Sequence, residues 1–223
     1  MSGAPLVVLE GIDGSGKGTQ ARRLREALEA RGLRVGSLTF PQYEANRFGR
    51  LVGRFLNGEF GPLDAVAPEL AALLFAGDRR ESAPELARLR DACDVVLLDR
   101  YVASNVAHQA SRVDGARRRT LVEFLDWLEH EHNGLPRPDA TVWLDIPPDL
   151  ARRRVAAKDA RDYTEREADI QEDDPGHLAG AAAVYQSMAG DQGWVRVTAV
   201  EDGRERTADE IAADVLAAAD AAL

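Results

Sequence analysis

The chain alternates between short apolar runs and longer segments in which apolar residues recur every three or four positions. Short apolar runs bounded by polar or turn residues predict buried strands, and helical spacing predicts amphipathic helices. The predicted strands cover residues 6–9, 35–40, 95–98, 141–144 and 195–200. Helices are predicted from 19 to about 32, through most of 44–92 with a break at 58–62, over 116–132 and over 208–222.

This order of elements predicts an α/β fold. Strands that are apolar along their whole length are typical of a parallel sheet with helices on both faces. The 223 residues suffice for one sizeable core, so we predict a single domain over residues 1–223 around a five-stranded parallel sheet. Residues 158–175 break the pattern, because they are rich in charged side chains and poor in apolar ones. Such a segment is either a solvated loop or a mobile lid.

Composition and charge restrict the classes of partner. The 38 acidic and 28 basic residues give a net charge of −10, which disfavours a nonspecific grip on nucleic acid. The apolar run near the start is too short for the core of a signal peptide, and no stretch approaches the roughly 20 apolar residues of a membrane helix. The single cysteine, Cys93, excludes an intrachain disulfide and fits a reducing compartment. We therefore expect a cytoplasmic protein with neither a membrane nor a nucleic-acid partner.

A glycine-rich segment between the first strand and the first helix carries the clearest chemistry. Residues 11–19 read Gly-Ile-Asp-Gly-Ser-Gly-Lys-Gly-Thr, which matches the phosphate-binding loop pattern through its lysine. The backbone N–H groups of such a loop and the positive end of the following helix bind phosphate oxygens, and Lys17 can reach the β- and γ-phosphates of ATP. This predicts a P-loop NTPase fold, with an unliganded glycine-rich turn as the alternative. The predicted ATP-binding residues are Gly11, Gly14, Ser15, Gly16, Lys17, Gly18 and Thr19.

The loop departs from the usual pattern at the position that ligates magnesium. Gly18 stands where a serine or threonine is usual, and the hydroxyl comes one residue later, at Thr19. We therefore expect Mg²⁺ to be held mainly by nucleotide phosphates and water. Asp99 ends the third predicted strand, at the edge where ligands of parallel sheets bind, and can hold a magnesium-bound water. Arg100 beside it suits a second phosphate, although both residues could instead form surface ion pairs.

Four further segments together resemble bacterial thymidylate kinases. They are Phe40-Pro-Gln-Tyr43, Leu74-Phe-Ala-Gly-Asp-Arg79, Asp99-Arg-Tyr-Val-Ala-Ser-Asn105 and Gly134-Leu-Pro-Arg-Pro-Asp139. The loop sequence Lys-Gly-Thr-Gln at 17–20 also occurs in adenylate kinases, so the decision depends on these segments. The resemblance runs from residue 6 to about 185. It implies transfer of the ATP γ-phosphate to dTMP, giving dTDP and ADP for dTTP biosynthesis, and a homodimer.

The resemblance also implies roles for individual residues. Asp13 would lie near the transferred phosphate and, like Asp99, near its metal. Phe75 would stack on thymine, Arg79 would hydrogen-bond the carbonyl edge of the base, and Arg100 would bind the dTMP phosphate. The remaining implied contacts are Phe40 and Tyr43 at the sugar and phosphate, Ser104 and Asn105 at the base, and Asp169 and Glu172 as an acidic pair over the sugar.

Two positions depart from the resemblance. His108, followed by Gln109, stands where relatives often place an aromatic residue against the deoxyribose, and Gln171 stands where tyrosine is frequent. All three residues are kept as candidate substrate contacts, but sugar discrimination is less well defined than base recognition. Considered singly, Phe75 and His108 fit core packing better than binding, and only their neighbours favour a site.

The predicted reaction requires cations rather than a general base. The phosphate of dTMP is largely a dianion at neutral pH, and phosphoryl transfer depends on positioning and charge stabilisation. At the loop, the predicted catalytic residues are Lys17, Asp13 and Arg100. Residues 13–16 contain no arginine, so we expect the lid to supply one. The available cations are Arg154, Lys158, Arg161 and Arg166, and we take the three arginines as catalytic candidates, although each could instead be a solvated side chain.

The sequence leaves two other functions open. One is a nucleoside monophosphate kinase with AMP or dCMP as acceptor, and the other is a non-catalytic P-loop nucleotide-binding module. Phe75 together with Arg79 favours thymine over the other bases. A GTPase is excluded because the chain has no Asn-Lys-x-Asp segment to read guanine.

Overall fold

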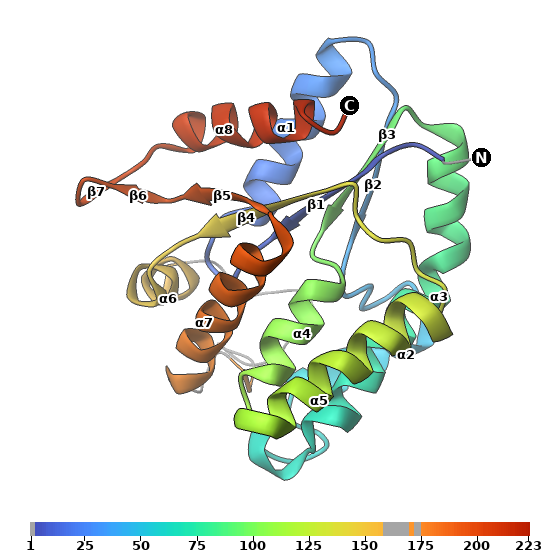
Figure 1. The fold of residues 1–223 in the computed structure, drawn as a ribbon, viewed down its shortest axis with the longest axis vertical. Coiled ribbons are helices and arrows are strands. Elements are labelled where there is room, and N and C mark those ends of the chain that lie inside the picture. Colours follow the sequence, from blue (N-terminus) through green and yellow to red (C-terminus); the bar gives the residue numbers. More distant parts are fainter. Residues whose placement is uncertain (1–2, 158–169, 172–174) are drawn as a thin grey trace.

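A five-stranded parallel sheet forms the centre of the molecule (Figure 1). The computed structural model describes residues 3–157, 170–171 and 175–223. The strands are β1 (Leu6–Glu10), β2 (Val35–Thr39), β3 (Val95–Asp99), β4 (Ala140–Asp145) and β5 (Val195–Thr198), in the order β2-β3-β1-β4-β5. All neighbouring pairs are parallel, so the predicted sheet is confirmed. The predicted lid at 158–175 falls almost entirely outside the described residues.

The strand order creates a crevice at the carboxyl end of β1. The chain leaves β1 toward β2 on one side and leaves β3 toward β4 on the other, which makes this a topological switch point where ligands of such sheets bind. The backbone N–H of Arg100 donates to the carbonyl of Leu9 at 3.0 Å and thereby holds the segments that follow β1 and β3 together. The phosphate-binding loop and the Asp99–Arg100 pair therefore open onto the same crevice.

Helices cover both faces of the sheet (Figure 1). On one face α1 (Lys17–Ala30) packs against α8 (Ala208–Asp220), and on the other lie α3 (Pro68–Ala92), α4 (Val102–Ala110) and α7 (Pro175–Gln192). The remaining helices are α2 (Arg47–Leu56), α5 (Gly115–Asp126) and α6 (Pro148–Ala156). The predicted break at 58–62 is confirmed, because α2 and α3 are separate helices joined through the short 3₁₀ segment η1 (Leu63–Ala65).

The helix predicted over residues 116–132 is α-helical in its first part and π-helical in its second. After α5 the chain continues as a π-helical segment, η2 (Trp127–His132), marked by a bond of 2.9 Å from the N–H of Asn133 to the carbonyl of Leu128. π-Helical turns often occur at functional sites. This turn directs Glu129 inward, where its side chain is completely buried.

The predicted fifth strand is shorter than expected, because its end forms a hairpin. β5 stops at Thr198, and β6 (Val200–Glu201) pairs antiparallel with β7 (Arg204–Glu205). Asp202 and Gly203 between them have φ angles of 48° and 77°. Positive φ at both central residues is the geometry that Asp-Gly adopts in tight hairpins.

A small second cluster of apolar side chains lies between α2 and α3, apart from the main core. Its buried members include Phe55 and Ala71, and the aromatic rings of Tyr43 and Phe75 pack against it. Phe75 meets Phe55 edge to face, with ring centroids 6.2 Å apart. This cluster holds two of the predicted substrate contacts in place.

None of the helices in the described part of the chain is both long and apolar enough to cross a membrane.

Candidate active site

The phosphate-binding loop takes the conformation that its glycines allow. Gly11, Gly14 and Gly16 have φ angles of 147°, 78° and 93°, and α1 begins directly after Gly16. A Cβ on Gly14 would lie 2.3 Å from the carbonyl oxygen of Ala151, so the start of α6 packs directly on the loop. The glycine is required there by both conformation and space.

Lys17 is folded back onto the loop. Its Nζ donates to the carbonyls of Gly11 and Ile12, each at 2.8 Å, and to Ser15 Oγ at 3.3 Å. Burial, and then the positive charge of Arg100, lower the pKa of Lys17 to about 8. These contacts keep the ammonium group at the mouth of the loop, where it can exchange carbonyls for phosphate oxygens.

Arg100 lies opposite the loop in a strained conformation. Its φ of 68° is rare for a residue with a side chain, and such outliers gather at functional sites. Its guanidinium donates to Asp13 Oδ1 at 2.5 Å, and to the carbonyl of Gly11 and to Ser104 Oγ, both at 3.2 Å. Burial disfavours the charged form of Arg100, but Asp13 and other acidic groups raise its pKa above the ordinary value. An anionic ligand at Arg100 would compete with Asp13.

Asp99, the other predicted metal-site residue, lies at the edge of the loop. Its Oδ2 is 3.4 Å from where a Cβ on Gly18 would be. Within the described residues, no group of three or more histidine, cysteine, aspartate or glutamate side chains could hold a metal ion. The expectation that phosphates and water supply most ligands of a magnesium ion here stays a prediction.

A pocket beside the loop gathers the predicted acceptor residues. All the predicted substrate contacts in the described part of the chain line it: Asp13, Phe40, Tyr43, Phe75, Arg79, Arg100, Ser104, Asn105, His108, Gln109 and Gln171. Apart from Gln171, they come from the segments that follow β1, β2 and β3 and from α3 and α4. The acidic pair, Asp169 and Glu172, and the arginines Arg161 and Arg166 lie outside the described residues, so their roles stay predictions.

The inner wall of this pocket contains a buried ion pair that the sequence did not reveal. Arg79 Nε lies 3.0 Å from Glu129 Oε2 and 3.2 Å from Oε1, and Arg79 Nη2 donates to Oε1 as well. Both side chains are almost inaccessible to water. Glu129 raises the pKa of Arg79 against the opposing effect of burial, so the guanidinium stays charged. Glu129 engages Nε and one N–H of Nη2, which leaves both N–H groups of Nη1 and the second N–H of Nη2 as donors toward a ligand.

Asn105 completes this wall. Its Nδ2 donates to the carbonyl of Ala72 at 3.1 Å and to Glu129 Oε1 at 2.9 Å. Both partners can only accept, which fixes the orientation of the amide. Its Oδ1 is buried and has no hydrogen-bond partner in the described structure. Arg79 and Asn105 therefore present a donor and a free acceptor to the same pocket.

Glu10 is a second residue that sequence reasoning missed. Its buried carboxylate ends β1 and accepts from the N–H of Tyr101 at 2.8 Å, Ser104 Oγ at 2.7 Å and Tyr185 OH at 2.9 Å. It thereby fixes the start of α4, which carries Ser104 and Asn105. Position alone could have signalled this role, because Glu10 is an acidic residue at the end of an otherwise apolar strand.

His108 forms a buried pair with His177 of α7. His108 Nδ1 and His177 Nε2 are 3.0 Å apart, and both side chains are buried. Burial, and then His177, lower the pKa of His108 well below its ordinary value, so the imidazole is neutral. His108 thus lines the pocket as an uncharged polar side chain.

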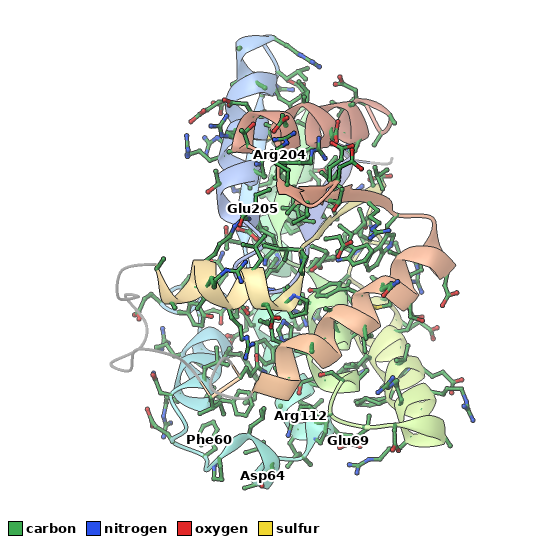
Figure 2. The ribbon with its side chains drawn as sticks, turned by 90° about the vertical axis from the view of Figure 1, so that its left-hand side faces the viewer. Phe60, Asp64, Glu69, Arg112, Arg204 and Glu205 are labelled. Atoms are coloured by element: carbon green, nitrogen blue, oxygen red, sulfur yellow. The ribbon has the colours of Figure 1, made fainter. Side chains whose placement is uncertain are left out.

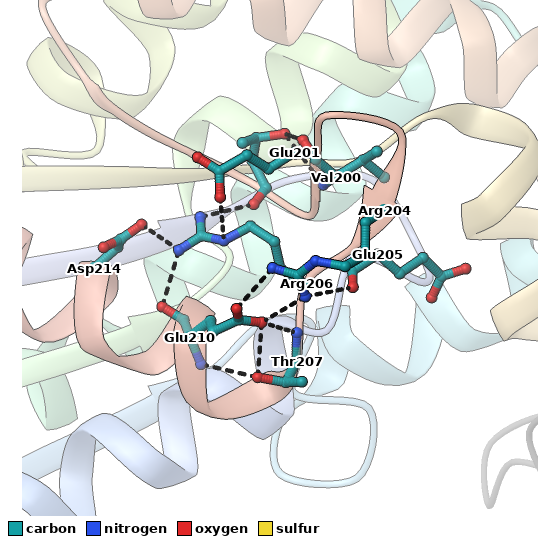
Figure 3. Close-up of polar contacts among 9 residues, drawn as sticks. Val200, Glu201, Arg204, Glu205, Arg206, Thr207, Glu210 and Asp214 are labelled. Carbon is teal, nitrogen blue, oxygen red and sulfur yellow. Dashed lines mark hydrogen bonds and ion pairs between the residues drawn. The ribbon is translucent and has the colours of Figure 1, made fainter.

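Arg154 lies in the last turn of α6, the helix that packs on the loop. It pairs with Glu205 of the β6–β7 hairpin at 3.3 Å (Figure 2 shows Glu205 beside Arg204). The hairpin is in turn fixed to α8 by an ion pair of 2.8 Å between Arg204 and Glu210 and by the bonds of Arg206 (Figure 3). Of the three candidate arginines, Arg154 alone is described, and in this structure its partner is Glu205.

A larger cavity, of about 390 Å³, lies at the other end of β4. It contains none of the loop residues. Its charged wall is already paired, because Arg137 makes two bonds of 2.8 Å to Asp126 and Asp139 accepts from the N–H of Leu6 at 2.7 Å. The smaller pocket beside the loop is therefore the better candidate for the acceptor.

Comparison with known proteins agrees with this geometry. The thymidylate kinase family model matches residues 9–211. A thymidylate kinase of Mycobacterium tuberculosis is 36% identical over 195 residues, covering 85% of this chain and 87% of the relative. A probable thymidylate kinase of Pyrococcus abyssi is 37% identical over 154 residues, covering 68% and 70%. The solved structure of Candida albicans thymidylate kinase has the same fold, with a TM-score of 0.72 at 21% identity, covering 99% of this chain and 93% of that one. The chain therefore belongs to the thymidylate kinase family.

Proposed function

We propose that this protein transfers the γ-phosphate of ATP to dTMP, giving dTDP and ADP. The observation that carries the proposal is the pocket beside the phosphate-binding loop, in which a buried arginine and a free amide oxygen lie opposite the cations of the loop. Family membership supports the same activity. A non-catalytic nucleotide-binding module would have no need for this second, polar pocket.

The base edge of dTMP suits the two polar groups of the inner wall. Thymine presents a carbonyl acceptor next to an N3–H donor, whereas cytosine presents an amino donor next to a ring acceptor. Arg79 Nη1 would donate to the thymine carbonyl, and Asn105 Oδ1 would accept from N3–H. Neither group can reverse its role, because guanidinium only donates and the Asn105 amide is fixed by its neighbours. Cytosine would leave buried polar groups unpaired, which a site of this kind rejects strongly.

The phosphate chemistry follows from the cations. Arg100 would bind the dTMP phosphate, and Lys17 would bind the phosphates of ATP, so that the two anions approach each other in one crevice. The dianionic acceptor attacks without a general base, and the protein stabilises charge on the transferred group. Hard oxygen donors near the loop, Asp99 and Asp13, fit Mg²⁺ through intervening water. When bound, the ion would neutralise charge on the phosphates.

A panel of acceptors tests the proposal. Purified protein with ATP and Mg²⁺ would be assayed for ADP release with dTMP, dUMP, dCMP and AMP. We expect dTMP to exceed dCMP and AMP in kcat/KM by about 10²-fold or more, as befits a hydrogen-bonding site. Asn105→Leu should reduce this preference without changing KM for ATP. Equal or better turnover with dCMP or AMP would refute the acceptor, and ATP binding without any turnover would favour the non-catalytic module.

We further propose a Mg²⁺-dependent homodimer that acts in the cytoplasm without nucleic acid. Support for an interface comes from α3, where Leu70 is 59% and Leu73 is 41% exposed on adjacent turns. Sedimentation velocity of Leu70→Lys/Leu73→Lys tests it, with Val195→Lys, 41% exposed on β5, as the matched control. We expect the wild-type protein and Val195→Lys to sediment as dimers and the α3 variant to sediment as a monomer. A wild-type monomer at micromolar concentration would refute the dimer.

A further inference from the structure

Gln109 has a carboxamide whose orientation is set by its surroundings. The side chain is completely buried and lines the acceptor pocket. Its Oε1 accepts from Arg112 Nη1 at 2.9 Å. Because a guanidinium only donates, the oxygen must face Arg112 and the NH₂ group must face away from it. That NH₂ group is buried and has no hydrogen-bond partner in the described structure.

Arg112 connects α4 to the segment between α2 and α3. Besides Gln109, it donates through Nη2 to the carbonyl of Leu63 at 2.6 Å and to the carbonyl of Val66. Figure 2 shows Arg112 near Asp64 of the same segment and near Glu69 of α3. Leu63 and Val66 pack against the apolar cluster that also holds Phe75. One side chain thus ties an amide of the pocket to the support of the predicted stacking residue.

Gln109 and Asn105 lie four residues apart on α4, so they share a face of the helix. With Arg79 they provide three hydrogen-bonding groups in one pocket: a donor, an acceptor and a second donor. The imide edge of thymine or uracil offers the complementary series of carbonyl, N–H and carbonyl. Cytosine matches only one of the three positions.

We propose that Arg112 is a positioning residue for base binding, which holds Gln109 so that Nε2 donates to the second carbonyl of the pyrimidine, the one at C2. This rests on the proposed function, in which the acceptor is dTMP. Arg112 itself touches neither substrate. Without it, the Gln109 amide can rotate by half a turn and present its oxygen, which would repel this carbonyl instead of binding it.

The main test is Arg112→Met. We expect KM for dTMP to rise about tenfold, the effect of about one hydrogen bond. Turnover at saturating dTMP and KM for ATP should change by less than threefold, because the loop and Arg100 are untouched. Arg112→Lys keeps the charge but has a single donor group, so it should restore the KM for dTMP only in part.

A matched control and a double variant separate positioning from stability. Arg118 also donates to main-chain carbonyls at the end of α4 and just after it, those of Ala110 at 3.0 Å and Val113 at 2.9 Å, and no hydrogen bond within the described residues joins it to Gln109. Arg118→Met should therefore leave KM for dTMP unchanged. In a Gln109→Leu background, Arg112→Met should cause no further rise in KM for dTMP, since the amide it positions is gone.

The results of these experiments distinguish a positioning role of Arg112 from a structural one. Equal rises in KM for dTMP in Arg112→Met and Arg118→Met, or additive effects of Arg112→Met and Gln109→Leu on that KM, would overturn the positioning role and leave a structural one. If Arg112→Met does not fold, Arg112→Lys carries the test, and an unchanged KM for dTMP in that folded variant would overturn the proposal. Failure of the wild-type protein to use dTMP would instead refute the proposed function, which the acceptor panel shows independently of any variant.

Discussion

Replacing Glu129 by glutamine tests the buried wall of the acceptor pocket. The carboxylate is 0% exposed and its partner Arg79 is 2% exposed. Glu129→Gln keeps the shape of the side chain but removes the charge that Arg79 requires. It also places an NH₂ group against the Arg79 guanidinium, and in one of the two amide orientations against the Asn105 amide as well, and both of these groups are donors. The variant therefore leaves a guanidinium buried without a counter-charge.

The expected cost follows from this burial. Breaking a buried pair by removing one partner costs about 3–5 kcal/mol, and the lower end applies because glutamine retains one acceptor oxygen. With a urea dependence of about 2 kcal/mol per molar, a loss of about 3 kcal/mol moves the unfolding midpoint down by about 1.5 M. KM for dTMP should rise as well, because Glu129 orients both Arg79 and Asn105.

The chain offers a close control three residues earlier. Asp126 makes two bonds of 2.8 Å to Arg137, but the side chains are 47% and 62% exposed. Asp126→Asn should cost less than about 1 kcal/mol, because solvent screens an exposed pair. Urea unfolding followed by circular dichroism measures both variants under one set of conditions. Equal midpoints for the two variants, or a loss below about 1 kcal/mol for Glu129→Gln, would refute the reasoning.

Three further predictions follow from the same site. Lys17→Ala should lower kcat by about 10²–10³-fold or more with an unchanged urea midpoint, and activity within about tenfold of wild type would contradict its assignment. The folded pKa of His108 lies below its unfolded value, so stability is present above about pH 6.5 and falls below it by up to about 1.4 kcal/mol per pH unit. His108→Gln should flatten this dependence in urea unfolding at pH 5–8, whereas the exposed His132→Gln should not. Gly14→Ala should destabilise the fold by about 1–3 kcal/mol more than Gly16→Ala, because its Cβ would meet a carbonyl at 2.3 Å while that of Gly16 meets nothing within 4 Å; equal thermal midpoints would show that the contact is relieved.

The parts of the fold that local sequence specifies were predicted correctly. The strands appear as short apolar runs, and the phosphate-binding loop as a glycine pattern, because each depends on neighbours in the chain. The predicted bounds of the strands were less accurate. The fifth strand was predicted to reach residue 200, but β5 ends at Thr198 and the chain continues into the hairpin that turns at Asp202–Gly203. This dipeptide is itself a hairpin signal.

The partners within the site could not be predicted in the same way. Glu129 lies 50 residues from Arg79, and His177 lies 69 residues from His108. Such pairs are set by how helices pack, and neither residue belongs to a recognisable motif. The resemblance placed Arg79 in the pocket, but only the structure shows that two of its nitrogen atoms are committed to Glu129.

The contact between Glu10 and Tyr185 bears on the order in which the molecule can be assembled. The two residues are 175 positions apart, at the end of β1 and on α7. The first strand and its loop are made early in synthesis, yet the carboxylate at the base of the crevice gains its last donor only when α7 arrives. Contacts of such long sequence separation form late, because closing the intervening chain costs entropy first. A growing chain therefore carries a complete nucleotide-binding sequence long before it has a finished acceptor pocket.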